Sequence, residues 1–112
     1  MSRPNYDGRR FAPIEASGEG DVGEATRFDY RQKGDVVWAT YRGGEVQMGT
    51  LIATVDARGA LDMRYAHVDA SGAMRTGSCH SVPEVLPDGR LRLHEVWEWT
   101  DGGSGTSTLE EV

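Results

Sequence analysis

In the stretch RLRLHEVWEWT, residues 90–100, apolar and polar residues alternate as they do in a β-strand. Successive side chains of a strand point to opposite sides, so one face collects four large apolar residues and one carboxylate: Leu91, Leu93, Glu95, Trp97 and Trp99. A carboxylate is costly to bury unless it is paired, protonated or wetted. The stretch therefore predicts a strand whose inner face holds Glu95 either in a hydrogen-bonded pair or beside a wet cavity.

Short turns recur before and after this stretch. Residues 56–59 (DARG) and 69–72 (DASG) share an acidic first position and a glycine in the fourth, which is typical of a type I turn with a glycine bulge. Residues 87–89 (PDG) and 43–44 (GG) mark further reversals. Turns about 8–12 residues apart, with no helical stripe between them, indicate an all-β sandwich or barrel.

Strands joined by short turns pair antiparallel in a meander, and a meander hides its edges by closing on itself. We therefore expect a small antiparallel up-and-down barrel of about eight or nine strands. Residues 1–10 and 17–25 read as loops, and the second, rich in glycine and acid, is either an entrance lid or a plain connection. The expected strands are 11–15, 26–31, 36–42, 45–55, 60–68, 73–82, 90–100 and 106–110.

The turns also predict which residues lie opposite one another. The turns at residues 56–59, 69–72 and 87–89, each with an aspartate, predict seven of these pairs. They are Gly49–His67, Leu51–Tyr65, Tyr65–Gly77, Met63–Cys79, Ser81–Glu95, Cys79–Trp97 and Gly77–Trp99. The Gly43-Gly44 turn would add Trp38 beside Gly49, with Phe28 beside Trp38. A slip of one residue inverts a strand's face, yet these registers all place the apolar residues on one side.

The inward-facing set is too polar for a dry core. Barrels of about eight strands either fill with side chains or hold one small ligand, and binding sites combine apolar walls with a few orienting polar groups. We therefore expect the interior to bind a small, partly apolar molecule. The candidate interior residues are Glu95, Trp97, Trp99, Tyr65, His67, Cys79, Ser81, Gln47, Trp38 and Tyr30.

Two other functions fit the same pattern. A small barrel enzyme of the isomerase, cyclase or hydrolase type would use Glu95 as acid or base with Tyr65 or His67. Cys79 is either a nucleophile or an inert buried thiol, and no catalytic residue is assigned. An assembly module would instead have a filled core and dimerise through outward apolar residues, which we expect to be Val37, Met48, Ile52, Val68, Met74 and Val96.

Composition limits the function classes. The 112 residues suit one domain, residues 1–112, and a net charge of -6 argues against nucleic acid or an anionic membrane as partner. A single cysteine, the absence of an apolar leader and the absence of a long apolar run predict a cytoplasmic protein. No phosphate-binding glycine motif occurs, and the outward histidines His80 and His94 do not suffice for a metal site. We expect no cofactor and no metal.

Several runs carry a resemblance: NYDGRRFAP (5–13), DMRY (62–65), TGSCHSVPE (76–84) and LPDGRLRLHEVWEWT (86–100). They resemble a family of short bacterial proteins that are often labelled N-acetylglutamate synthase, and the resemblance implies a calycin-type barrel but no catalytic residue. Acetyl transfer from acetyl-CoA to glutamate is associated with a glycine-bearing loop at a helix start, and the sequence predicts no helix. We therefore do not expect that activity. The matching positions are Asp62, Arg64, Tyr65, Gly77, Cys79, Ser81, Glu84, Glu95, Trp97 and Trp99.

Overall fold

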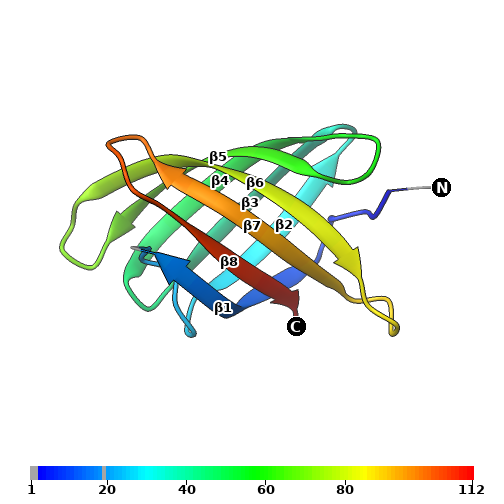
Figure 1. Cartoon of the computed structure of the whole chain (residues 1–112), viewed down its shortest axis with the longest axis horizontal. Coiled ribbons are helices and arrows are strands. Elements are labelled where there is room, and N and C mark those ends of the chain that lie inside the picture. The colour runs from blue at the N-terminus through cyan, green and yellow to red at the C-terminus, as the bar shows by residue number, and fades with distance from the viewer. Residues whose placement is uncertain (1–2, 19) are drawn as a thin grey trace.

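The chain forms a closed barrel of eight antiparallel strands, each paired with the next along the chain (Figure 1). The computed structural model describes residues 3–18 and 20–112. The predicted all-β up-and-down meander is thus confirmed, with eight strands. The strands are β1 (Arg10–Gly18), β2 (Arg27–Lys33), β3 (Val36–Gly43), β4 (Val46–Val55), β5 (Leu61–Asp69), β6 (Met74–Val85), β7 (Leu91–Trp99) and β8 (Ser104–Glu111).

The acidic turns set the register of the second half of the barrel. Asp56 Oδ1 accepts hydrogen bonds from the backbone N–H groups of Arg58 and Ala60, at 2.9 and 3.0 Å. Asp69 does the same for the next turn. Each side chain thus holds its own turn closed, and the predicted partners are confirmed. The observed pairs include Gly49–His67, Leu51–Tyr65, Tyr65–Gly77, Met63–Cys79, Ser81–Glu95, Cys79–Trp97 and Gly77–Trp99.

The prediction for Trp38 and Gln47 is wrong. A β-bulge between Val46 and Met48 shifts β4 by one residue against both neighbours, and Gln47 is the extra residue. Gln47 therefore points outward, where its Nε2 donates to the Asp69 carbonyl oxygen at 2.9 Å. The same shift reverses the face of β3, so that Trp38 is exposed.

Tyr41 takes the place that was predicted for Trp38. It lies opposite Gly49 on β4 and opposite Phe28 on β2, and its ring stacks on Phe28 with centroids 4.8 Å apart. A side chain at Gly49 would overlap the Tyr41 ring, so glycine is required there. The reversal also buries Val37, which the sequence placed on the outer surface.

The N-terminal segment closes one end of the barrel. Tyr6 is fully buried, packs against Tyr30, and donates from its hydroxyl to the Gly59 carbonyl oxygen. Tyr30 packs in turn against Phe11, with ring centroids 4.9 Å apart. Tyr30 faces inward as predicted but belongs to this filled end. The sequence predicts residues 1–10 only as a loop and does not predict the buried position of Tyr6.

The first and last strands are longer than predicted and close the barrel by pairing with each other. Their ladder runs from Phe11 opposite Glu111 to Gly18 opposite Gly105, with a register shift between Pro13 and Glu15. Proline cannot donate to a ladder, which accounts for irregularity at this point. Residues 17 and 18, which were predicted as part of the connection to β2, therefore belong to β1.

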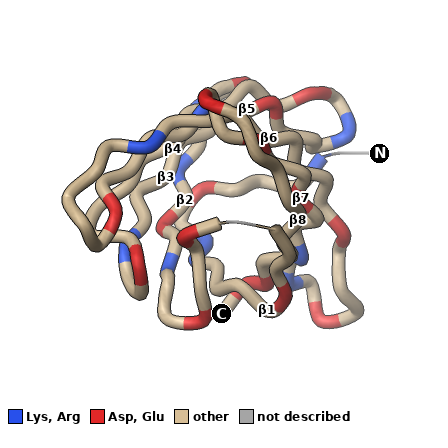
Figure 2. Tube along the Cα trace, turned by 60° about the vertical axis from the view of Figure 1, so that its left-hand side comes forward, with Lys and Arg blue, Asp and Glu red and all other residues tan. Residues whose placement is uncertain are grey.

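Basic and acidic residues alternate along the chain around the barrel (Figure 2). Exposed apolar side chains, such as Ile52 and Val96, lie among them. Arg64 pairs with Asp62 at 2.8 Å, and Arg10 pairs with Asp29 at 2.7 Å. In the part of the chain that the structure describes, no helix is long and apolar enough to cross a membrane. The exposed residues among those expected for assembly are Met48, Ile52, Met74 and Val96, while Val68 is half-buried.

Candidate functional site

A cavity of about 160 Å³ occupies one end of the barrel, and Tyr6 of the N-terminal segment is not among the residues that line it. The β1–β2 connection supplies part of its wall through Gly20, Asp21 and Val22. Six of the predicted candidates line it: Glu95, Trp97, Trp99, Tyr65, His67 and Cys79. Ser81 is buried beside Glu95, Tyr30 lies at the filled end, and Trp38 and Gln47 are outside.

Glu95 lies at the inner end of the cavity, with only 9% of its surface exposed. Its Oε1 accepts a hydrogen bond from Ser107 Oγ on β8 at 3.2 Å. Ser81 lies opposite Glu95 on β6, and its nearby hydroxyl favours the ionised carboxylate, which lowers the pKa of Glu95. The geometry between the two groups nevertheless falls short of a hydrogen bond. Burial raises the pKa of Glu95 to about 7, and the two serine hydroxyls only partly offset this rise. Both protonation states are therefore populated near neutral pH.

Cys79 also lines the cavity but is not an activated thiol. Burial raises its pKa far above the ordinary value, and the nearby Glu95 carboxylate raises it further. His67 does not lie opposite it, because His67 pairs with Arg75 on β6. A thiol with a raised pKa is a poor nucleophile, so the inert reading of Cys79 is the one that the geometry supports.

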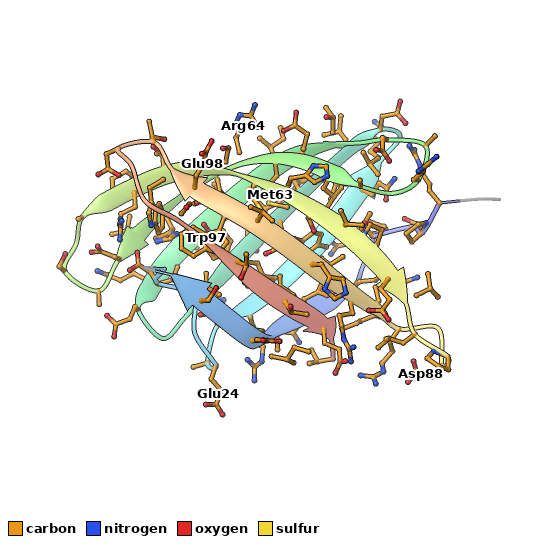
Figure 3. All side chains as sticks on the ribbon, in the orientation of Figure 1. Glu24, Met63, Arg64, Asp88, Trp97 and Glu98 are labelled. Atoms are coloured by element: carbon orange, nitrogen blue, oxygen red, sulfur yellow. The ribbon has the colours of Figure 1, made fainter. Side chains whose placement is uncertain are left out.

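Aromatic rings form the walls of the cavity. The Trp97 and Trp99 ring centroids lie 5.7 Å apart, and Tyr65 meets Trp99 edge to face at 5.5 Å. The Trp97 ring lies against Gly105 on β8, where any side chain would overlap it. In Figure 3, Trp97 lies toward the end of the barrel that holds the cavity, while Arg64 points away from the strands. Glycine on β8 thus makes room for a tryptophan on β7.

A chain of hydrogen bonds crosses the top of the cavity. Tyr41 Oη lies 2.9 Å from His67 Nδ1, and His67 Nε2 lies 2.9 Å from Asp21 Oδ2. An ionised carboxylate only accepts, so in neutral His67 the proton is on Nε2 and Nδ1 accepts from the tyrosine hydroxyl. Both ring nitrogens of this buried histidine are satisfied, which holds its ring and the Asp21 side chain in fixed positions.

Arg75 lies at the rim of the cavity, where it contacts the lining residues Asp21 and Trp99. Its guanidinium lies 3.3 Å from Asp21 Oδ2 and stacks on the Trp99 ring, 3.8 Å from the centroid. Asp21 is therefore contacted by a cation and by an imidazole N–H, both from strands far from its own connection. These contacts hold Asp21 in place, and with Gly20 and Val22 it forms part of the cavity wall.

Three contributors to the site were missed from the sequence. The predicted register of β3 places Tyr41 on the wrong face, and Ser107 lies in the short final strand, for which the sequence predicts no inward face. Asp21 lies in a loop whose excess of glycine and acid was the only local signal. On the outer face, His94 Nε2 lies 2.8 Å from Glu84 Oε1. Across residues 3–18 and 20–112, no group of His, Cys, Asp or Glu is arranged to hold a metal ion.

The comparison with protein families agrees with this architecture. The model of the family described as avidin-like protein matches residues 4–112. The chain belongs to the avidin-like family. No curated protein and no solved structure matches the chain significantly. The closed eight-strand meander is the barrel expected of an avidin-like protein, and the calycin-type barrel implied by the sequence resemblance is confirmed.

Proposed function

We propose that this avidin-like protein binds a small, partly apolar molecule inside its barrel. The observation that carries the proposal is the cavity itself, walled by Trp97, Trp99 and Tyr65 and ending at the buried Glu95. Apolar walls with a few polar groups at fixed positions are the usual composition of a small-molecule site. The family supports it, because avidin-like barrels bind small ligands in their interior.

The size of the cavity limits the ligand. A buried apolar cavity of about 150 Å³ accommodates a benzene molecule. The cavity here, at about 160 Å³, therefore suits a molecule of about one ring with a few further atoms, part of which would reach the opening. At the other end of the barrel, the buried side chains of Tyr6, Phe11 and Tyr30 occupy the interior.

A catalytic role is the second candidate, and one observation favours it. A general acid or base works best with a pKa near the working pH, and Glu95 has a pKa of about 7. In that case Glu95→Gln would abolish turnover of a bound substrate while leaving its binding measurable.

A cytoplasmic location and a second copy of the chain as partner remain predictions.

Tryptophan fluorescence tests the proposal directly. Trp97 and Trp99 line the cavity, whereas Trp38 is on the outer face, so a Trp38→Phe background reports mainly on the cavity. Three probes of nearly equal size are suitable: benzylamine, benzyl alcohol and phenylacetate. We expect at least one to change the emission saturably and to raise the melting temperature with concentration. If all three fail to do so, the proposal is wrong.

A further inference from the structure

The charges that line the cavity are unbalanced. Its lining includes two carboxylates, Asp21 and Glu95, and no lysine or arginine among the described residues. The chain as a whole also carries a net charge of -6. An anionic ligand would therefore meet carboxylates without a lining cation to pair with.

The two carboxylates differ in how they are compensated. Asp21 is paired with Arg75 and accepts a hydrogen bond from His67 Nε2. Glu95 has only neutral hydroxyl neighbours, Ser107 and Ser81, and no ion pair with it occurs in the described part of the chain. A buried carboxylate without a cation is unfavourable when ionised, so a cation entering the cavity would supply what Glu95 lacks.

We propose that the ligand is a small organic ammonium compound with an apolar or aromatic body, whose positive group becomes the counter-ion of Glu95. This rests on the proposed function and adds the chemical class of the ligand. The walls fit the same class, because the faces of tryptophan and tyrosine rings attract ammonium groups within about 6 Å of the ring centroid. The Trp99 ring already makes such a cation–π contact with the Arg75 guanidinium at the rim of the cavity. A short ammonium compound would place its charge at Glu95 and its body against Trp97.

Such binding would be linked to protons through Glu95. An ammonium ligand binds the ionised carboxylate, so at a pH below about 7 the protein must release a proton to bind it. A neutral ligand with a carbonyl oxygen would do the opposite, because it would accept a hydrogen bond from the protonated carboxyl group. The direction of the pH dependence therefore separates the two ligand classes.

The other titratable groups of the interior do not obscure this measurement. Those that act electrostatically with Glu95 are phenols and a thiol whose pKa values are all raised by burial, so they stay neutral from about pH 5 to about pH 9: Tyr6, Tyr30, Tyr41, Tyr65 and Cys79. The residues of β1, β4 and β8 that line the cavity with Glu95 are not titratable. The immediate neighbours of Glu95 on the adjacent strands are Ser81 and Ser107. His67, Asp21 and Arg75 at the rim are unchanged in a Glu95 variant, so that variant measures their contribution.

Calorimetric titration of the full chain with the three benzyl probes tests the inference. We expect benzylammonium to bind at least tenfold more tightly than benzyl alcohol, and phenylacetate to bind weakest. Between about pH 7 and about pH 5 the affinity for benzylammonium should fall up to about tenfold per pH unit, with proton release seen as a dependence on buffer ionisation enthalpy.

Two variants complete the test. Glu95→Gln should lose most of the preference for benzylammonium and its dependence on pH, while circular dichroism shows a folded barrel. Glu98→Gln, on the outer face of the same strand, should behave as the wild type (Figure 3). Tighter binding of benzyl alcohol or phenylacetate, or affinity for benzylammonium that does not fall below pH 7, overturns the ammonium inference but leaves small-molecule binding intact. Failure of all three probes overturns both.

Discussion

His67 Nε2 on β5 donates a hydrogen bond to Asp21 Oδ2 in the β1–β2 connection over 2.9 Å. In the ring of eight strands β5 lies opposite β1, so this contact joins two sides of the barrel across the cavity. Arg75 on β6 adds a second contact to the same carboxylate. One side chain therefore anchors the connection that forms part of the cavity wall.

Removal of this anchor should free the connection more than it destabilises the barrel. In Asp21→Ala the N–H of His67 and the guanidinium of Arg75 lose their acceptor, and hydrogen bonds of this charged kind contribute about 1.5–3 kcal/mol. We expect amide hydrogen exchange in residues 20–25 to accelerate at least tenfold, while β4 to β7 stay protected. Mass spectrometry of exchanged peptides measures both.

A matched control is Asp29→Ala, which removes the exposed ion pair with Arg10 on the outer face. Exposed pairs contribute less than about 1 kcal/mol, so this variant should leave exchange in residues 20–25 unchanged. Equal exchange in the Asp21 variant and the wild type would show that the β1–β2 connection is held by packing and not by Asp21.

The stability of the protein should depend on pH through Glu95. Its folded-state pKa of about 7 lies above the ordinary value of 4.5, so the folded state binds the proton more tightly than the unfolded state. This stabilisation is fully present below about pH 4.5 and is lost as the pH rises through about 7. Between about pH 5 and about pH 8 the loss amounts to roughly 2–3 kcal/mol.

Glu95→Gln isolates this effect because glutamine does not titrate. Denaturant unfolding of both proteins should show the variant gaining stability relative to the wild type as the pH rises, with most of the change between about pH 5 and about pH 8. Parallel stability curves would mean that Glu95 is not buried as a carboxylate without a cation.

The thiol of Cys79 should be nearly inert in the folded protein. Its pKa is raised by burial and by Glu95, so very little thiolate exists at about pH 8. We expect iodoacetamide to alkylate the native chain at least a hundredfold more slowly than the chain unfolded in urea, as measured by intact mass. Alkylation of the native protein at the rate of the unfolded chain would contradict the raised pKa and revive Cys79 as a nucleophile.

The part of the fold that the sequence predicted correctly is the part whose signals are local. Asp56 and Asp69 each close their own turn through hydrogen bonds two and four residues ahead, so the pairing of β4 with β5 and of β5 with β6 follows from short motifs. In the turn between β6 and β7, Asp88 Oδ1 accepts a hydrogen bond from the backbone N–H of Arg90 at 3.1 Å, so the same local signal sets the pairing of β7. The three turns together carried six candidate residues, including Glu95 and Trp97, into the cavity.

The errors arise where the deciding contact is distant in sequence. The bulge at Gln47 has no turn motif of its own, yet it reverses β3 and exchanges Trp38 for Tyr41. Asp21 meets His67 across 46 positions, and Tyr6 meets Gly59 across 53. Only the closed barrel brings these residues together, so strand alternation and turn motifs did not predict them.

The register of β3 can be tested at Gly49, because this residue lies opposite Tyr41 and not beside Trp38 as predicted. A methyl group at Gly49 would overlap the Tyr41 ring, which packs on Phe28 and hydrogen-bonds to His67. We expect Gly49→Ala to lower the free energy of unfolding by about 1–3 kcal/mol, the usual effect of overpacking in a filled interior. Gly23→Ala is the control, because an added methyl group there meets no atom within 4 Å. The two variants should separate clearly in urea unfolding; equal stability would mean that Tyr41 does not lie over Gly49 and that the β3 register differs.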